Sequence, residues 1–282
     1  MGFEREPVGP RALSIALLDR RIRFESAFSS IFQILASSFG AVVAPDAIAR
    51  SDVLTYEVRV ASDSRSFVLY CQGEHLLDAA TPDDLLFGIE KSLTVELQKR
   101  RPDLYFLHAA AVERKGKAFV LAADSGKGKS TTTWALLHHG FRYLSDELSA
   151  IDLQSMRVFP YPHALCLKQR PPAYPLPPST IDLGRTLHVP VDSLPGEVVT
   201  EPLPLGGLFL VRYRPDLKTP ELHSVSPAEA GARLYLTALN ALSHSSRGLD
   251  AAIEIAARVP CYAIHSADLP ATCALIRSAL PA

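Results

Sequence analysis

This sequence of 282 residues is poor in cysteine, lacks long apolar runs and shows no excess of one charge. Its four cysteines lie far apart, without a CxxC pair or a histidine at metal spacing. This argues against a disulfide framework or a cysteine-based zinc site and favours buried thiols in a reducing compartment. The first residues, MGFEREPVGPRALSIALLDRR, show no signal-peptide pattern, and nowhere do about 18 apolar residues run together. We therefore expect a soluble cytoplasmic protein without a membrane span. The cysteines are Cys71, Cys166, Cys261 and Cys273.

The charges nearly cancel, with 29 Lys and Arg against 30 Asp and Glu and a formal net charge of −1. A protein that neutralises a nucleic-acid backbone carries a basic excess, and one that binds anionic lipid carries a polybasic run. Neither occurs here, so neither a nucleic acid nor a membrane is an expected partner. Hydrophobic residues make up 48% and charged residues 21%, the balance of a globular chain with one large domain or two modest ones.

Residues 1–100 are expected to form a small mixed α/β accessory unit. Alternating stretches predict strands, and apolar residues at helical spacing predict helices. Thr81, followed by proline, is a start signal for the helix expected over Asp84–Lys99, the clearest one of this part. The helix expected over Phe28–Phe39 has three serines as candidate caps, namely Ser26, Ser29 and Ser30. The expected strands are Ala12–Leu18, Ile22–Glu25, Thr55–Val60 and Ser66–Cys71, and the expected helices are Phe28–Phe39 and Asp84–Lys99.

Residues 101–282 follow a different pattern and are expected to form a second domain. Strands, a glycine-rich loop, a helix and further strands follow one another in the order of an α/β nucleotide-binding unit. Gly140 stands where a glycine ends the loop helix. The proline-dense stretch Pro171–Ser179 can form neither a helix nor a central strand; a surface connection is favoured and a mobile lid is the alternative. The expected strands are Tyr105–Val112, Lys117–Ala123, Arg142–Leu144, Leu148–Leu153, Leu205–Arg212 and Val259–Ile264, and the expected helices are Ser130–His139, Pro227–Ala241 with Ser226 as its cap, and Leu269–Leu280.

The segment Ala123–Ser130 reads ADSGKGKS, close to the Walker A pattern G-x-x-x-x-G-K-[ST]. Such a P-loop needs glycine at Gly126 and Gly128, so that successive backbone N–H groups can curl around phosphate oxygens. Lys129 would place its charge on the β- and γ-phosphates, and Ser130 would offer its hydroxyl to Mg²⁺. The expected ligands are therefore ATP and Mg²⁺, bound by Asp124, Ser125, Gly126, Lys127, Gly128, Lys129, Ser130 and Thr131.

Ala123 replaces the first glycine of the pattern. Alanine would be strained there if the position needed a positive φ, and harmless if it merely ends the preceding strand, which is the interpretation we favour. The loop otherwise fits, because it follows an apolar strand and opens a helix. No NKxD-type guanine-reading motif is present, which disfavours a GTPase.

Two further features narrow the chemistry. Asp146 and Glu147 end the next strand, where paired acids can serve Mg²⁺ and a substrate hydroxyl; a solvated turn fits the spacing equally well. His108 lies just before the loop strand. An imidazole beside a γ-phosphate can donate a hydrogen bond or move a proton, whereas a lone histidine is more often a core residue.

Together, the residues from Leu107 to Ile151, LHAAAVERKGKAFVLAADSGKGKSTTTWALLHHGFRYLSDELSAI, resemble the catalytic core of the HPr kinase/phosphorylase family. They are closer still to the shorter HPr kinase-like proteins, some of which phosphorylate lasso peptides. The resemblance implies an α/β fold with a P-loop core of the HPr kinase/carboxykinase type, preceded by the small N-terminal unit.

The resemblance also implies catalytic roles for His108, Lys129, Asp146 and Glu147. It favours Asp146 as the base on the acceptor hydroxyl and Glu147 as the acid on the metal side, with Ser130 as a further metal ligand. Asp146 counts among the candidate metal ligands as well. Glu147 replaces a family aspartate, and the glycine-rich segment tied to phosphorylase activity is missing, so HPr and the reverse reaction are not expected.

The expected function is an ATP-dependent phosphotransferase that moves the γ-phosphate to a hydroxyl of a peptide, a protein or a small metabolite. The alternative is a non-catalytic ATP-binding accessory protein, which the changes at Ala123 and Glu147 would suit. True HPr kinases are hexamers, so a homo-oligomer remains open.

Outside the core the candidates are weaker. Lys168, in a Pro-Tyr-Pro…Lys segment like that of the shorter relatives, either reaches a phosphate or is a plain surface lysine. Arg212 and Arg214 either clamp an anion or lie in a solvated loop. His138 and His139 end the loop helix, where they suit its dipole. No triad-like grouping is evident among His163, His223, His244 and His265.

Overall fold

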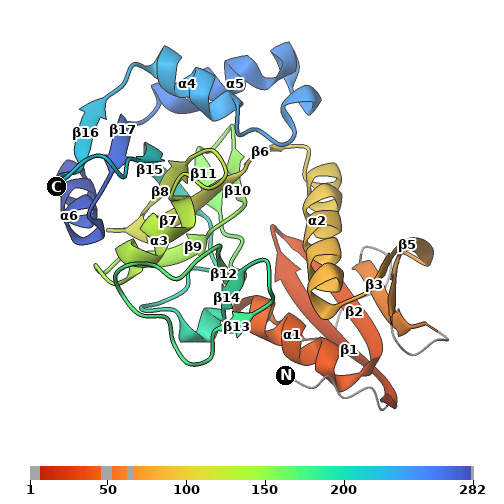
Figure 1. Ribbon diagram of the computed structural model, residues 1–282. Coiled ribbons are helices and arrows are strands. Elements are labelled where there is room, and N and C mark those ends of the chain that lie inside the picture. Colours follow the sequence, from red (N-terminus) through yellow and green to blue (C-terminus); the bar gives the residue numbers. More distant parts are fainter. Residues whose placement is uncertain (1–6, 46–52, 62–65, 281–282) are drawn as a thin grey trace.

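The computed structural model describes residues 7–45, 53–61 and 66–280, which form a mixed α/β structure with three sheets (Figure 1). The first sheet lies wholly in the N-terminal part and keeps its five strands in sequence order. Ile15 pairs with Ile22 across the antiparallel turn that opens it. Two helices pack against this sheet. The strands are β1 (Pro7–Leu17), β2 (Arg20–Phe28), β3 (Val53–Val60), β4 (Phe67–Cys71) and β5 (Glu74–Ala79), and the helices are α1 (Ser29–Phe39) and α2 (Pro82–Arg100).

Both expected helices of this part are confirmed, but only one of the expected caps. Thr81 caps α2, because its Oγ1 accepts a hydrogen bond from the N–H of Asp84 at 3.1 Å. The serine cap expected for α1 is wrong: the N-cap residue is Phe28, which has no side-chain cap. Ser26 instead donates from its hydroxyl to the carbonyl of Val58 within the sheet, at 3.0 Å. The edge strand β5 was not expected, because its sequence EHLLDA is mostly exposed and lacks an apolar alternation.

The second sheet has the order β6-β10-β11-β15-β8-β7-β9, with β17 beside β15 and β16 beside β17. Successive residues of a strand face opposite sides, so Val120 packs in the core beneath α4 and α5, and Leu121 in the core beneath α3 and α6. The sheet is therefore covered by helices on both faces. Its strands are β6 (Leu104–Leu107), β7 (Ala109–Arg114), β8 (Lys117–Ala122), β9 (Arg142–Ser145), β10 (Ser149–Asp152), β11 (Arg157–Phe159), β15 (Leu203–Tyr213), β16 (Glu221–Ser224) and β17 (Cys261–Ser266). The helices are α3 (Lys129–Leu137), α4 (Pro227–Tyr235), α5 (Leu249–Ala257) and α6 (Leu269–Ala279).

A third, short sheet has the order β12-β14-β13. One of its strands precedes the proline-dense segment in the chain and the other two follow it; the segment itself has no regular secondary structure. Its strands are β12 (Leu165–Leu167), β13 (Ile181–Asp182) and β14 (Leu187–Val189). Short 3-10 turns are η1 (Gly40–Val42), η3 (Val191–Ser193), η4 (Ala241–Ser243) and η5 (Ser245–Gly248).

Two expected elements of the second domain differ from the structure. The strand expected over Tyr105–Val112 is two strands, because the chain leaves β6 at His108, whose N–H donates to the carbonyl of Thr237 at 2.7 Å. The helix expected over Pro227–Ala241 ends at Tyr235. Helix α5 was not expected.

Strand β6 contributes side chains to the cores of both parts of the chain. Leu104 and Phe106 belong to the core of the N-terminal part, whereas Tyr105 and Leu107 face the core beneath α4 and α5. The sheets thus separate near residue 100, but the packing continues across it. A division into domains 1–100 and 101–282 stays a prediction.

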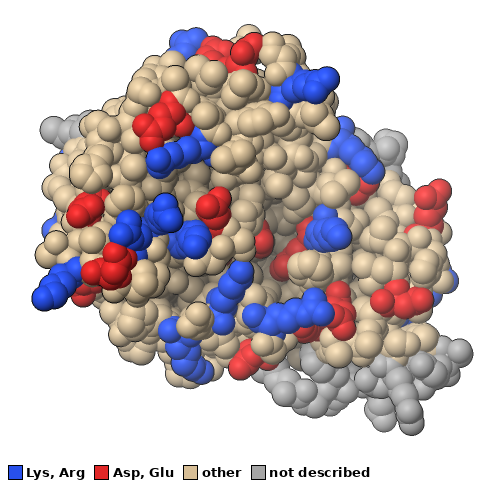
Figure 2. Space-filling model, turned by 45° about the horizontal axis from the view of Figure 1, so that its top comes forward, with Lys and Arg blue, Asp and Glu red and all other residues tan. Residues whose placement is uncertain are grey.

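The molecular surface carries mixed charge. Lys and Arg side chains are interspersed with Asp and Glu over the face displayed in Figure 2. None of the helices in the described residues combines the length and the apolar character needed to cross a lipid bilayer.

Candidate active site

The loop between β8 and α3 carries the Walker A residues. Gly126 and Gly128 have φ values of +77° and +95°, a left-handed conformation that glycine adopts without strain. Ala123 is buried directly after β8 and does not have a positive φ, so alanine is not strained at this position. That the replacement leaves nucleotide binding intact stays a prediction. The loop is tied to the neighbouring strand, because Tyr213 N–H donates to the carbonyl of Lys127 at 2.9 Å. Asp124, Ser125, Gly126 and Lys127 are exposed, Gly128, Ser130 and Thr131 are half-buried, and Lys129 is buried.

Lys129 opens α3 and points toward the break between β6 and β7. Its Nζ lies 3.2 Å from Nε2 of His108. An ammonium group can only donate, so Nε2 accepts and the imidazole is neutral. Burial lowers the pKa of His108 and the charge of Lys129 lowers it further, which favours that neutral form. Burial also lowers the pKa of Lys129, opposed by the carboxylates of Asp146 and Glu147.

Asp146 follows β9 and is almost fully enclosed, with 2% of its surface exposed. Its Oδ2 accepts a hydrogen bond from the N–H of Cys166 at 3.0 Å. Its Oδ1 is buried and has no hydrogen-bond partner among the described residues. Burial raises the pKa of this carboxyl, against the charge of Lys129, which lowers it. An unpaired buried carboxylate oxygen is costly unless a cation or a donor meets it, so Oδ1 is a candidate position for such a group.

Glu147 is half-exposed and faces a buried histidine: its Oε2 lies 3.7 Å from Nε2 of His163. Nδ1 of His163 contacts the carbonyl of Ala164 at 2.5 Å, which holds the ring in place. Burial works against a charge on His163, but the carboxylates of Glu147 and Glu90 outweigh it and raise its pKa to about 9. The ion pair with His163 in turn lowers the pKa of Glu147 to about 2. The raised pKa favours the protonated form of His163, which lies directly behind the second acid of the pair.

Glu90 links the Glu147–His163 pair to the N-terminal part of the chain. It lies on α2, and burial raises its pKa to about 7, against the attraction of His163. Its position could have been found in the sequence, because Glu90 follows Leu86 by four residues and precedes Leu93 by three, on the apolar stripe of the helix. An acid on such a stripe signals a buried partner.

Lys168 contacts the Walker A loop, whereas the choice between a phosphate ligand and a plain surface lysine stays a prediction. It follows β12, and its Nζ donates to Oγ of Ser125 at 2.9 Å. The same short strand places Cys166 against Asp146. The segment after the acid pair thus borders both the Walker A loop and the acids.

The proline-dense segment packs on the end of α3 that is remote from the loop. Trp134 Nε1 donates to the carbonyl of Tyr174 at 2.8 Å, and the Tyr174 ring stacks on His138 with centroids 4.7 Å apart. Nε2 of His139 lies 2.6 Å from the Tyr174 hydroxyl, so both histidines hold the segment. Just beyond the end of α3, Nη1 of Arg114 on β7 donates to the carbonyl of His139 at 2.9 Å and brings a cation near the helix end.

A pocket of about 370 Å³ borders the Walker A loop on the β15 side. Lys127, Arg212 and Arg233 line it together with Asp124 and His265. Arg212 thus lies where it can meet an anion. Arg214 instead forms a salt bridge with Asp216, outside the pocket lining. A hollow of about 520 Å³ on the first sheet has none of these residues in its wall.

The structure brings His108, Lys129, Asp146 and Glu147 together at the start of α3. The expectation of no triad-like grouping among the remaining histidines is wrong for two of them, because His223 and His265 lie together with Glu221 on β16 and β17. His163 is not part of a triad but contacts Glu147. His244 lies elsewhere, its Nε2 3.1 Å from Nδ2 of Asn240.

Comparisons with known proteins give little further guidance. No protein-family model matches the chain, and no curated protein matches it. Among solved structures, the chain is similar to the Hpr(Ser) kinase/phosphatase from Coxiella burnetii, with 12% sequence identity over 61% of this chain and 94% of that one. The TM-score is 0.32. A likeness this small supports no functional conclusion, so the function has to be inferred from the residues of this chain.

Proposed function

We propose that the chain is an ATP-dependent phosphotransferase that moves the γ-phosphate to a hydroxyl of a peptide, a protein or a small metabolite. One observation carries the proposal: the buried, unpaired Oδ1 of Asp146 lies in the same site as the Lys129–His108 contact, beside a glycine-rich loop that opens a helix. A basic group for phosphate and an acid for a hydroxyl are the two elements that phosphoryl transfer requires of a protein.

The loop and the helix would bind the phosphates. The first N–H groups of α3 have no partner within the helix and point along its positive end, so they suit an anion. Lys129 has three N–H donors and can therefore contact a phosphate oxygen while still donating to His108. Lys168, held at Ser125, would add a second positive charge at the loop.

The acids and Ser130 are suited to Mg²⁺, which prefers oxygen ligands. Glu147 keeps its negative charge through its contact with His163, and Asp146 offers an oxygen that no other described group satisfies. Mg²⁺ held there would supply positive charge that offsets the negative charge developing on the phosphates during transfer. Glu147 and Ser130 are the residues that we propose to hold it.

Asp146 is then the proposed base. Its pKa is raised by burial, which makes it a better proton acceptor than an exposed aspartate. It would take the proton of the acceptor hydroxyl as the hydroxyl oxygen bonds to the γ-phosphorus. The bond from that phosphorus to the bridging oxygen breaks, and ADP leaves with the electron pair.

A thermal-unfolding titration tests the nucleotide site. Wild type, Lys129→Ala and Lys91→Ala are each heated with Mg²⁺ and ATP, GTP or pyrophosphate. Ligand at about 1,000 times its Kd adds about 4 kcal/mol to the unfolding free energy, which raises the midpoint by several degrees. We expect ATP to stabilise wild type and Lys91→Ala, which alters an exposed lysine on α2, but not Lys129→Ala.

No stabilisation of wild type by any of the three ligands would contradict the proposal. Stabilisation by ATP without release or transfer of its γ-phosphate would favour an ATP-binding accessory protein instead.

A further inference from the structure

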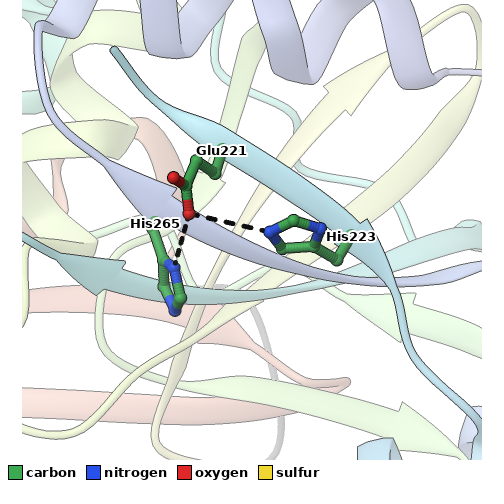
Figure 3. Close-up of side chains that lie close together, drawn as sticks. All are labelled: Glu221, His223 and His265. Atoms are coloured by element: carbon green, nitrogen blue, oxygen red, sulfur yellow. Dashed lines mark hydrogen bonds and ion pairs between the residues drawn. The ribbon is translucent and has the colours of Figure 1, made fainter. Parts of the chain in front are cut away.

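Three side chains with metal-binding atoms converge on one face of the strand pair β16–β17 (Figure 3). Glu221 and His265 are direct partners in the antiparallel register. His223 lies two residues beyond Glu221 and so projects from the same face of its strand. The pairing of the strands therefore produces the cluster.

The distances in the cluster suit a small tetrahedral ion. Oε2 of Glu221 lies 3.4 Å from Nδ1 of His265 and 3.7 Å from Nε2 of His223. In Figure 3 the carboxylate lies between the two rings. Two ligands of a tetrahedral ion bound at about 2.1 Å are about 3.4 Å apart. All three ligand atoms lie within 4.8 Å of one another, so a shared ion requires only small side-chain movements.

The chemistry of the donors selects the class of metal. Two imidazoles and one carboxylate suit zinc and its neighbours among the divalent transition metals, whereas Mg²⁺ prefers oxygen ligands alone. We propose that Glu221, His223 and His265 bind a divalent transition-metal ion of the zinc class, with a fourth position open to solvent. Side-chain exposures of 46%, 63% and 28%, respectively, leave that position accessible.

The site adjoins the nucleotide region and shares none of the residues His108, Lys129, Asp146 and Glu147, although one of its ligands lines the neighbouring pocket. His265 also lines the pocket that borders Asp124 and Lys127 of the Walker A loop. On its other side His265 pairs with Arg212 of β15, which brings a positive charge next to the three ligands. Glu221 carries the only negative charge among the three ligands, and this charge offsets that cation. Metal affinity should therefore depend most on the Glu221 carboxylate.

A calorimetric titration of the full chain with Zn²⁺, in the absence of nucleotide, tests the site. We expect one ion per chain, bound at least about tenfold more weakly by Glu221→Gln, His223→Ala and His265→Ala. His75→Ala is the matched control, because His75 is an exposed strand histidine that contacts an acid, Asp78, at 3.0 Å. It should bind Zn²⁺ as wild type does. Co²⁺ should give the intense visible absorption of a tetrahedral complex in wild type and lose it in Glu221→Gln.

Absence of Zn²⁺ binding, or equal weakening by His75→Ala and by the three ligand variants, would overturn the inference. The test does not depend on the proposed phosphotransfer. Lys129→Ala should bind Zn²⁺ normally even though it is expected to lose ATP, so failure of one proposal is distinguishable from failure of the other.

Discussion

Nε2 of the buried His163 lies 3.7 Å from Oε2 of Glu147, so the second acid of the candidate site is backed by a histidine from the segment that follows it. The contact lowers the pKa of Glu147 and raises that of His163. Glu147 therefore stays ionised throughout the physiological pH range, as a metal-side acid requires. Glu90 of α2 contributes to the charge on His163, which connects the N-terminal part with the site.

This pair predicts a pH-dependent stability. The pKa of His163 rises from 6.5 in the unfolded chain to about 9 in the folded one, so only the folded chain keeps the proton between these values. Its stabilising contribution is complete below pH 6.5 and is lost as the pH rises toward 9. Between these two pH values, wild type should lose about 2 kcal/mol more of its unfolding free energy than His163→Gln.

Urea denaturation at both pH values measures this difference. His75→Gln, an exposed histidine, is the control and should follow wild type. The same pH dependence in wild type and His163→Gln would contradict a charged His163.

The glycines of the loop predict a contrast between two small substitutions. Gly128 has a φ of +95°, and an added Cβ would lie 3.3 Å from Cβ of Tyr213. Gly128→Ala should therefore lower the unfolding free energy by about 1–2 kcal/mol and weaken ATP binding. Ala123→Gly should bind ATP within about twofold of wild type, because Ala123 does not have the backbone conformation that needs glycine. Denaturation and ATP titration of the two variants check this. A large gain in ATP affinity in Ala123→Gly would show that the alanine weakens ATP binding.

Trp134 is the single tryptophan and reports on the proline-dense segment. Its indole N–H donates to the Tyr174 carbonyl at the end of α3 that is remote from the Walker A loop. If the segment is a surface connection, ATP and Mg²⁺ should leave the tryptophan emission unchanged, whereas Tyr174→Ala should alter it. A change in emission on adding ATP, absent in Lys129→Ala, would favour the lid alternative.

The candidate site could be predicted from the sequence where its residues are close in the chain. The Walker A loop and the acid pair are evident from local patterns, as are the helices α2 and α3. The break at His108 was missed because a tertiary contact, from His108 to Thr237, ends an otherwise continuous apolar stretch. An edge strand such as β5 lacks an apolar alternation because most of its side chains face solvent.

Contacts between distant segments explain the remaining omissions. The carboxylate of Glu90 on α2 raises the pKa of His163 from a distant part of the chain, and His265 contacts Glu221 through strand pairing. No spacing in the chain encodes either relationship. What the sequence does contain is the unusual acid on the apolar stripe of α2, which indicates a buried partner without naming it.

ATP turnover by Asp146→Asn tests the central claim most directly. Wild type and Asp146→Asn are compared at saturating ATP and Mg²⁺ for release of γ-phosphate to water or to an added hydroxyl acceptor, with the exposed Asp250→Asn as control. We predict that Asp146→Asn folds and binds ATP but turns it over at least about 100-fold more slowly, because a general base is lost. Turnover equal to that of wild type and Asp250→Asn would contradict the assignment of Asp146 as the base and, with it, the proposed phosphotransferase site.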